Sequence, residues 1–407
     1  MKALVLAGGF PQIALLNELK QRGYETILAD YYAQPVAKPY ADKFYQVSTL
    51  DAEAITNVAK DEQVDFLVTV CTDQALLTVA KVSEDLGLPC YVDYQTALNV
   101  TNKQYMKKVF VENNISTAKH IIMATLDVEK LKDLQFPLIV KPVDCNSSKG
   151  VKRVENLQEL ERAFNDAVNL SRTNTAIVEE FIEGDELSVD VYVEDGKANI
   201  LSVSSLDKIA DNDKFVIFRG RYSEEVYNRV HNLVCGIAQQ IADAFGIKNS
   251  PMLIQLITDG KRAFVLEFSA RTGGGVKYML IKKASGFDVI SAVVDLTLGK
   301  TPHIEKVKPE NKYIFNEFIY CKPGVFDRLD GFDQLKDSGV ISEYCLFKWK
   351  GAEFYGIENS GDRVAGFTIQ ADTYEDLKYK HKKAVEGMKV LDTKGVDIMR
   401  RDLLTDI

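Results

Sequence analysis

The N-terminal part of the chain alternates short apolar runs with amphipathic segments, and this alternation limits the possible folds more than any other feature. The expected elements are a strand over Ala3–Ala7, a turn at Gly8-Gly9, a helix over Ile13–Arg22 and a strand over Tyr24–Ala29. The pattern continues with a helix over Ala52–Lys60, a strand over Val64–Val70, a helix over Gln74–Leu86 and a short strand over Pro89–Val92. Strands that alternate with helices predict a doubly wound parallel sheet, which is an α/β fold.

Two acidic residues follow strands of this predicted sheet, at the edge where open α/β sheets bind ligands. Asp30 comes after the second strand, but the Gly8-Gly9 turn lacks the G-x-G-x-x-G series, so we do not predict a dinucleotide site. Asp73 comes after the strand over Val64–Val70 and directly before a helix. We interpret Asp73 as the helix N-cap, with a substrate contact as the alternative.

The bulk composition excludes several classes of protein. A chain of 407 residues is too long for one compact core and predicts two or three domains. The formal net charge of −9 argues against a nucleic-acid partner, and no apolar run is long enough to span a membrane. The six cysteines are scattered without a C-x-x-C pair, and the N-terminus has no signal-peptide pattern, so we expect a cytoplasmic protein.

One stretch, Phe264–Gly275, combines groups that rarely occur together. Glu267 interrupts an apolar strand, Arg271 follows four residues later, and three glycines come next. A carboxylate in an apolar strand is costly unless it is paired or bound to a metal. An arginine fork grips an anion, and glycines let backbone N–H groups approach a phosphate or carboxylate. The stretch therefore indicates either a site for phosphoryl transfer or a buried Glu–Arg ion pair followed by a flexible turn.

Lysines and small polar residues mark the region before this stretch. A helix opens at Asn102–Lys108, and by default we expect its lysines to be solvated. Lys141 ends a fully apolar strand over Phe136–Val140, where a lysine is expensive to desolvate unless it faces an anion. The loop Asn146–Gly150 is small and polar. Its hydroxyl and N–H groups fit either a cover over phosphates or an ordinary hairpin.

Two further pairs of residues have spacings that fit a nucleotide and a metal. Glu179 and Glu186 lie seven residues apart in a strand–connector–strand segment. A purine amino group and ribose hydroxyls need such acceptors, but a charged surface hairpin has the same pattern. Gln255 and Glu267 fall on neighbouring strands joined by the hairpin signal Asp259-Gly260, which brings both side chains within reach of one metal ion.

In order and spacing, these motifs resemble those of the ATP-grasp superfamily. They are Lys103, a second lysine, Lys141, on an apolar strand, the small-residue loop Asn146–Gly150, the E-E-F-I-x-G-x-E stretch that starts at Glu179, and the E-x-x-x-R-x-G-G ending that starts at Glu267. The resemblance covers nearly the whole chain. It is closest to the branch that holds L-amino-acid ligases, biotin carboxylase, carbamoyl-phosphate synthase and phosphoribosylglycinamide synthetase.

The resemblance implies a mixed α/β and α+β fold with three domains. Residues 1–98 would form a Rossmann-like doubly wound domain that precedes the ATP-grasp domain. Residues 99–303 would form the ATP-grasp domain itself, whose two subdomains bind ATP and Mg²⁺. Residues 304–407 would form a C-terminal α+β domain packed on it.

The resemblance also implies roles for individual residues. Contacts with ATP would come from Lys103, Lys141, Ser147, Ser148, Gly150, Glu179, Glu180, Phe181, Ile182, Glu186, Lys208 and Leu266. Among these, Glu179 would accept the adenine amino group and Glu186 would hold the ribose, while Lys208 has a plain surface lysine as its alternative. The metal ligands would be Gln255, Glu267 and Ser269. They would bind Mg²⁺, or Mn²⁺ as a substitute for Mg²⁺. The catalytic residues would be Arg271, which binds the substrate carboxylate and its phosphorylated form, and Lys141.

One residue departs from the family pattern. The family usually has asparagine two residues after the metal-binding glutamate, and this chain has Ser269 there. A hydroxyl is a weaker ligand than an amide oxygen, so the number of magnesium ions stays open.

The function implied by the resemblance is that of an ATP-dependent carboxylate–amine ligase, acting on small molecules. It would phosphorylate an amino acid or small carboxylate to an acyl phosphate, couple that to an amine, and release ADP and phosphate. The alternatives are a purine synthetase that joins glycine to a phosphoribosylamine, a bicarbonate-activating carboxylase or carbamoyl-phosphate-type enzyme, and a nucleotide-binding regulator without catalysis. The chain has no G-x-x-x-x-G-K-S/T loop, which disfavours a P-loop NTPase. A homodimer is the family's habit, and the oligomeric state stays open.

Overall fold

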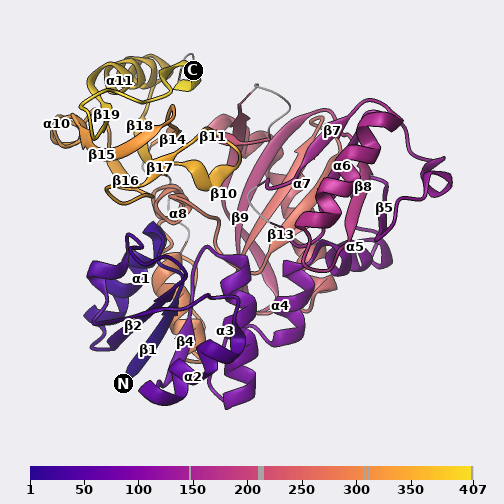
Figure 1. Ribbon diagram of the computed structural model, residues 1–407, viewed down its shortest axis with the longest axis horizontal. Coiled ribbons are helices and arrows are strands. Elements are labelled where there is room, and N and C mark those ends of the chain that lie inside the picture. Colours follow the sequence, from indigo (N-terminus) through magenta and orange to yellow (C-terminus); the bar gives the residue numbers. More distant parts are fainter. Residues whose placement is uncertain (146–147, 210–214, 306–308, 310, 405–406) are drawn as a thin grey trace.

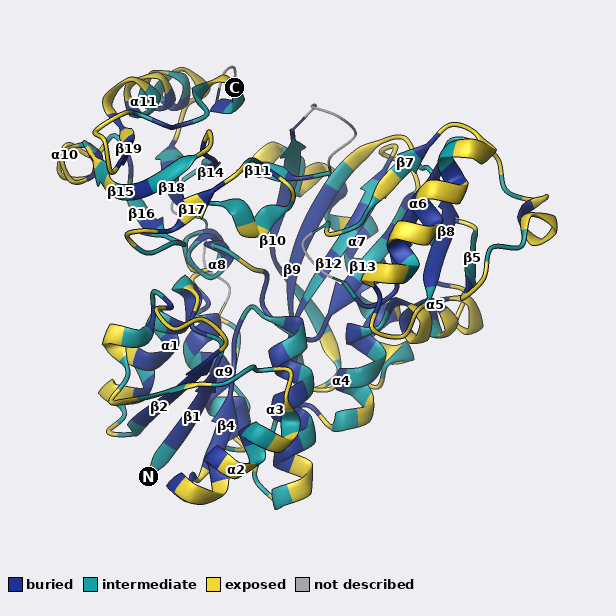
Figure 2. Ribbon diagram, viewed as in Figure 1, coloured by how far each residue is buried: buried dark blue, intermediate teal, exposed yellow. Residues whose placement is uncertain are grey.

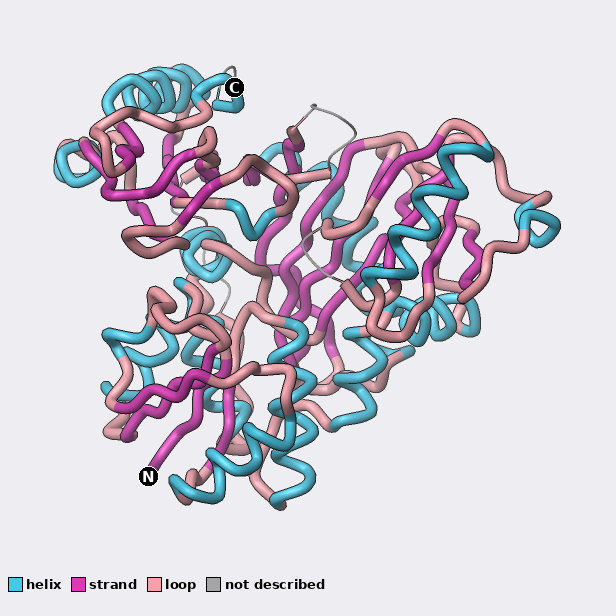
Figure 3. The backbone as a smooth tube through the Cα atoms, viewed as in Figure 1, coloured by secondary structure: helices cyan, strands magenta, loops and turns pink. Residues whose placement is uncertain are grey.

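The strands in the described part of the chain form four sheets, arranged in three neighbouring parts of the molecule (Figure 1). The structure is a computed structural model that describes residues 1–145, 148–209, 215–305, 309, 311–404 and 407. Figure 1 shows a small parallel sheet at the lower left, two antiparallel sheets at the centre and right, and the C-terminal elements at the upper left. Figure 3 shows that helices and strands are mixed throughout all three parts.

The N-terminal sheet has four parallel strands in the order β3-β2-β1-β4, as the alternating pattern predicts. The strands are β1 (Lys2–Leu6), β2 (Glu25–Asp30), β3 (Lys43–Gln46) and β4 (Phe66–Val68). The connecting helices are α1 (Phe10–Gln21), η1 (Lys38–Tyr40), α2 (Ala52–Glu62) and α3 (Asp73–Leu86). The helix α1 begins three residues before the predicted start because Pro11 fits a first helical turn.

Helices cover both faces of this sheet, and one of them comes from far along the chain. Side chains of α1 and α9 (Val289–Thr297) pack on one face, and side chains of α2 and α3 pack on the other. Figure 2 shows β1, β2 and β4 as mostly buried and the outer faces of the helices as exposed. An ion pair of 2.6 Å between Arg22, the C-cap residue of α1, and Asp295 of α9 joins the two helices. The N-terminal sheet therefore depends on a helix from the second half of the sequence.

The predicted strand over Pro89–Val92 is wrong. The segment is an irregular connection between α3 and α4 (Tyr94–Thr101). Val92 is buried and packs with Ala97 and Val100 in the core beside these helices. The apolar run thus reflects burial of a short connection, which has the same composition as a buried strand.

The large sheet is antiparallel and has eight strands, in the order β13-β12-β9-β10-β11-β14-β18-β16. Its first five strands along the chain are β9 (Asp185–Glu194), β10 (Lys197–Lys208), β11 (Ile217–Ser223), β12 (Ser250–Thr258) and β13 (Ala263–Ser269). The helix α7 (Glu224–Ala244) packs on the sheet, and α8 (Lys277–Ser285) follows β13. The predicted hairpin of β12 and β13 is confirmed, and it pairs Gln255 with Glu267.

The small sheet is antiparallel and has the order β5-β8-β6-β7. Its strands are β5 (His120–Met123), β6 (Leu138–Pro142), β7 (Lys152–Val154) and β8 (Ala176–Glu180). The helices in this part are α5 (Lys103–Glu112), η2 (Val128–Leu131) and α6 (Leu157–Leu170). Since β8 belongs to this sheet and β9 to the large one, the segment between Glu179 and Glu186 crosses from one sheet to the other and is no surface hairpin.

The C-terminal part continues the large sheet, because β14 pairs with β11. Its elements are β14 (Tyr313–Ile319), β15 (Gly324–Asp330), α10 (Phe332–Asp337), β16 (Glu343–Leu346), β17 (Glu353–Phe354), η3 (Ser360–Asp362), β18 (Ala365–Ala371), α11 (Tyr374–Gly387), β19 (Lys389–Asp392) and η4 (Arg401–Leu404). A third antiparallel sheet, β17-β15-β19, lies beside it. The domain limits 1–98, 99–303 and 304–407 stay a proposal. None of the helices in the described ranges combines the length and the apolar character that a bilayer crossing requires.

Candidate active site

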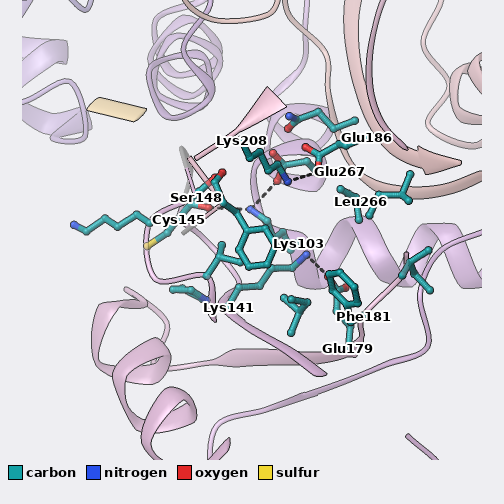
Figure 4. A pocket seen from close by; sticks show the side chains of 18 of the residues that line it. Lys103, Lys141, Cys145, Ser148, Glu179, Phe181, Glu186, Lys208, Leu266 and Glu267 are labelled. Atoms are coloured by element: carbon teal, nitrogen blue, oxygen red, sulfur yellow. Dashed lines mark hydrogen bonds and ion pairs between the residues drawn. The ribbon is translucent and has the colours of Figure 1, made fainter. Parts of the chain in front are cut away.

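A cleft of about 820 Å³ lies between the small sheet and the large sheet. Most of the residues predicted to contact ATP or metal line this one cleft (Figure 4). They are Lys103, Lys141, Ser148, Glu179, Glu180, Phe181, Ile182, Glu186, Lys208, Gln255, Leu266 and Glu267. These residues come from α5, from the strands β6, β8, β9, β10, β12 and β13 of the two sheets, and from the connections between them, so the fold brings together groups that are far apart in the sequence.

The predicted phosphate loop reaches across the cleft. The Ser148 hydroxyl donates a 2.9 Å hydrogen bond to the backbone oxygen of Phe215, which precedes β11 of the opposite sheet. Gly150 has a φ of +74°, and a Cβ there would come within 2.7 Å of the Leu170 side chain, so a glycine is required. Gly150 shapes the loop but is not among the lining residues of the cleft. Ser147 lies outside the described residues.

On the small-sheet wall, one buried carboxylate faces two lysines. Glu179 of β8 is 2% exposed, and Lys141 of β6 donates a hydrogen bond to its Oε1 atom. The Oε2 atom lies 3.2 Å from Nζ of Lys107, which is on α5. Burial alone would raise the pKa of Glu179, but the two ammonium groups outweigh burial and lower this pKa to about 2. Glu179 is therefore ionised at neutral pH, and the cluster carries one surplus positive charge.

The expectation that the lysines of α5 are solvated is wrong for two of them. Lys107 is fully buried and Lys103 is 7% exposed, while the side chain of Lys108 is 71% exposed. Lys103 and Lys107 are four residues apart and so lie on the same face of the helix, which here faces the protein interior. Burial lowers the pKa of Lys107 to about 8, even though Glu179 acts in the opposite direction.

On the large-sheet wall, the predicted metal-binding residues lie side by side. Gln255 of β12 and Glu267 of β13 are direct cross-strand partners, and the Glu267 side chain faces the cleft. Lys103 lies 3.0 Å from Oε2 of Glu267 and donates a 2.9 Å hydrogen bond to the backbone oxygen of Cys145. Partial burial would raise the pKa of Glu267, but the charge of Lys103 outweighs it and lowers this pKa. Figure 4 shows Lys103 and Glu267 approaching each other from separate elements.

Glu186 and Lys208 form a further charged contact in the cleft. The two side chains, from β9 and the end of β10, make an ion pair, and Lys208 also lies 4.9 Å from the centre of the Phe215 ring. The plain surface lysine that was the alternative for Lys208 is thus wrong, since its side chain lines the cleft.

The segment after Glu179 forms the edge of the cleft. The Phe181 N–H donates a 3.0 Å hydrogen bond to the backbone oxygen of Pro137. The Arg153 guanidinium lies 4.4 Å from the centre of the Phe181 ring. The Glu180 carboxylate accepts a hydrogen bond from the Gln135 N–H. The side chains of Glu180 and Phe181 are thus held by neighbouring segments, which fixes the backbone that leads to Ile182.

The donor set at Gln255 and Glu267 fits a magnesium ion that also binds phosphate. Carboxylate and amide oxygens are hard ligands, and Mg²⁺ in proteins commonly takes one or two such ligands together with substrate phosphates and waters. Within the described ranges, no cluster of three or more His, Cys, Asp and Glu side chains is placed to hold a metal.

A second cleft of about 320 Å³ adjoins the first and shares Lys103, Gln255 and Glu267 with it. Arg271 lines this second cleft together with Asp73, the first residue of α3. The Arg271 guanidinium donates to both carboxylate oxygens of Asp73, with a distance of 2.7 Å between Nε and Oδ1. The hydroxyl of Ser269 donates to the same carboxylate. Burial would raise the pKa of Asp73, but Arg271 outweighs it and lowers this pKa.

These contacts correct two expectations. Asp73 is not the N-cap of α3, since Thr72 occupies that position and the Asp73 side chain turns toward Arg271. The alternative of a buried Glu–Arg ion pair is also wrong, because Glu267 pairs with Lys103 and Arg271 pairs with Asp73. An aspartate after a strand does not by itself reveal a partner almost two hundred residues away.

Sequence reasoning missed Lys107 as a member of the site. Its position four residues after Lys103 was the available signal, since both lie on one face of the same helix. Lysines on a polar helix are usually solvated, and for this reason the signal is weak.

The arrangement was compared with known proteins. Residues 134–279 match the family model described as ATP-grasp domain. This part of the chain is similar to ATP-grasp domains. It includes Lys141, the loop after it, Glu179, Glu186, Gln255, Glu267 and Arg271. The family predicted from the sequence is therefore confirmed.

Two curated relatives are similar to this chain. The carbamoyl phosphate synthase large chain of Clostridium acetobutylicum is 21% identical, over 94% of this chain and 38% of the relative. The formate-dependent phosphoribosylglycinamide formyltransferase of Prochlorococcus marinus is 30% identical, over 45% of this chain and 48% of the relative. The chain thus spans less than half the length of either protein.

Solved structures share the fold. The L-amino acid ligase of Bacillus licheniformis superposes with a TM-score of 0.78 at 20% identity, covering 96% of this chain and 98% of that chain. The biotin carboxylase domain of the Hydrogenobacter thermophilus 2-oxoglutarate carboxylase, described as a complex with MgADP, ADP and bicarbonate, gives a TM-score of 0.78 at 16% identity, covering 99% and 92%. The predicted combination of a parallel N-terminal sheet with an ATP-grasp fold is confirmed.

Proposed function

We propose that the protein is an ATP-dependent carboxylate–amine ligase that acts on an amino acid or another small carboxylic acid. The observation behind this proposal is the convergence of Lys103, Lys141 and Lys208 on one cleft that also contains Gln255 and Glu267. Cations near phosphate and oxygen ligands for a metal are what a phosphoryl transfer needs, since it requires little acid–base chemistry from the protein.

The reaction would have two steps. A carboxylate oxygen of the acid forms a bond to the γ-phosphorus of ATP, and the bond from that phosphorus to the β–γ bridging oxygen breaks, which gives an acyl phosphate and ADP. The amine nitrogen then bonds to the acyl carbon, the bond from this carbon to the phosphate oxygen breaks, and the nitrogen loses its proton. The products are an amide, ADP and phosphate.

The residues of the first cleft would bind and orient the nucleotide. Glu179 would accept the adenine amino group and Glu186 the ribose hydroxyls, while Lys103 and Lys141 would contact the phosphates. Gln255 and Glu267 would hold Mg²⁺, which supplies charge that offsets the developing negative charge on the phosphoryl oxygens. In this arrangement the lysines would exchange their carboxylate partners for phosphate oxygens.

The second cleft would bind the acid. Arg271 is the residue suited to a carboxylate or an acyl phosphate, because its fork already holds a carboxylate, that of Asp73, in bidentate fashion. The cleft is small, and it adjoins Glu267, so an acid bound there would lie beside the proposed metal site. An acid would take the place of the Asp73 carboxylate on Arg271.

The test is phosphate release from Mg-ATP across a panel of amino-acid pairs, followed by mass analysis of the product. A ligase releases phosphate only when both an acid and an amine are present and forms a product lighter by one water than their sum. ADP release stimulated by bicarbonate without an amine would instead assign the chain to the bicarbonate-activating relatives. Absence of ADP release with every acid, amine and bicarbonate tested, in protein that binds ADP, would contradict catalysis and leave a nucleotide-binding regulator.

A further inference from the structure

A lysine lies directly behind the wall of the first cleft. Lys107 on α5 is fully buried. Lys141 and Glu179 are among the described residues that line the cleft, and Lys107 is not. A group in this position reaches a ligand only through Glu179, so any effect of Lys107 on binding is indirect.

The contacts of Lys107 all come from the protein interior. Its Nζ atom lies 3.2 Å from Oε2 of Glu179 and donates a hydrogen bond to the Thr117 hydroxyl. That hydroxyl donates in turn to the backbone oxygen of Val265, at 2.7 Å. Because Val265 is on β13, this chain of contacts ties Lys107 to the strand that bears Glu267. A ligand in the cleft does not compete for any of these contacts.

Lys141 has a different position on the same carboxylate. It binds Oε1 of Glu179 and also faces the cleft, so a phosphate that enters competes with Glu179 for it. If Lys141 were the sole cation beside Glu179, moving it to a phosphate would leave a buried carboxylate without compensation, which is strongly unfavourable. With Lys107 present, Glu179 keeps a cation on its other oxygen.

We infer that Lys107 is the permanent counter-ion of Glu179 and a positioning residue of the nucleotide site, which holds Glu179 ionised while Lys141 moves to a phosphate oxygen. This inference rests on the proposed function, because it assumes that the cleft binds a nucleotide. The two lysines on the Glu179 carboxylate would thus have different tasks. Lys107 would stay paired with Glu179, whereas Lys141 would leave Glu179 for a phosphate oxygen when the nucleotide binds.

The experiment is calorimetric titration of the full chain with Mg-ADP and, separately, with adenosine. In Lys107→Met, Lys141 is retained by Glu179, and we expect ADP affinity to fall about tenfold, a size common for coupling between groups. Adenosine has no phosphate to attract Lys141, so its affinity should fall much less. Lys108→Met is the matched control, since that side chain is 71% exposed on the same helix, and it should change neither affinity.

Two further measurements separate positioning from a general structural effect. In a Glu179→Gln background, Lys107→Met should cause little additional loss of ADP affinity, because there is no charge left to compensate. The pH profile of the unmodified protein requires no variant. Burial lowers the pKa of Lys107 to about 8, so ADP affinity should decline above this pH, and the decline should be absent in Lys107→Met. The charged groups that face Lys107 are Glu179, Lys141 and Lys103, and burial lowers the pKa of nearby His120, which titrates below this range.

The possible results distinguish failure of the role inferred for Lys107 from failure of the proposed function. An equal loss of ADP and adenosine affinity in Lys107→Met, or a constant ADP affinity of the unmodified protein from about pH 7 to about pH 9.5, overturns the role of Lys107. If the unmodified protein binds ADP and only the variant results differ from expectation, the inference fails and the proposed function stands. If the unmodified protein binds no ADP at any pH, the proposed function itself fails.

Discussion

The two ends of the active-site region differ in how their charges are balanced. At the first cleft, which is proposed to bind ATP and is called the nucleotide end below, the Glu179 carboxylate faces both Lys107 and Lys141, which leaves one positive charge in excess. At the second cleft, which is proposed to bind the acid and is called the acceptor end below, Arg271 and Asp73 neutralise each other one to one. The nucleotide end is thus ready for an anion, whereas the acceptor end can bind an acid only by exchanging one carboxylate for another. We expect the nucleotide to bind readily alone and the acid to meet competition from the protein.

The largest expected effect breaks the acceptor end alone. Arg271→Ala should lower turnover about a hundredfold to a thousandfold, because it removes a cation from the transferring phosphoryl and acyl groups. ADP affinity should stay the same, because Arg271 lines the second cleft and not the first. Steady-state kinetics and ADP titration measure the two quantities. Arg262→Ala is the control, since this arginine is exposed at the turn after β12. Normal turnover in Arg271→Ala would remove this residue from the site.

The next effect breaks the nucleotide end. Lys141→Ala should weaken ADP binding roughly thirtyfold, which corresponds to the loss of one partner of a buried charge contact. Lys107 still neutralises Glu179 in this variant, so the wall of the cleft should keep its shape. Calorimetry measures the affinity, and Lys152→Ala serves as the control because Lys152 pairs with Asp166 on the surface. An ADP affinity equal to that of the parent would show that Lys141 has another task.

A smaller effect sharpens the contrast by removing the competitor at the acceptor end. Asp73→Asn keeps the shape of the side chain but gives up its charge, so Arg271 is held less tightly and is available to the acid more often. The KM for the acid should therefore fall, by roughly threefold to tenfold, while the KM for ATP stays constant. The same change should lower the thermal unfolding temperature, since the largely buried side chain of Arg271 loses its counter-ion. An increase in the KM for the acid would instead mean that Asp73 contacts the substrate.

Much of the fold and of the first cleft could be predicted because the signals are local. Strand–helix alternation, glycine stops and the Asp259-Gly260 turn depend on neighbours in the sequence, and they gave the parallel sheet and the β12–β13 hairpin. The order and spacing of the motifs supported the resemblance to the ATP-grasp superfamily, and this resemblance implied most of the residues that line the cleft between the two sheets. The sizes and limits of helices deviate by a few residues, as with the start of α1.

What could not be predicted depends on partners far away in the sequence. The burial of Lys107 follows from its contact with Glu179, which lies on the strand β8, and within the helix only the weak signal of its position four residues after Lys103 distinguishes Lys107 from the solvated Lys108. The pairing of Asp73 with Arg271 joins the N-terminal sheet to the ATP-grasp domain, and each residue has a plausible local role without the other. Ion pairs between distant elements decide which charged residues turn inward, and sequence spacing contains no information about them.

The smallest expected effect concerns Ser269, which the resemblance places among the metal ligands. In the structure its hydroxyl proton is directed to the Asp73 carboxylate, so this group takes part in the neutral acceptor end. Ser269→Ala should therefore shift the KM for the acid slightly, in the same direction as Asp73→Asn, and leave the Mg²⁺ concentration for half-maximal activity unchanged. Loss of a true ligand or of its immediate support would raise that concentration about tenfold or more. A magnesium titration of the variant distinguishes the two cases. A tenfold rise would assign Ser269 to the metal site, together with Glu267 of the same strand, and not to the acceptor end.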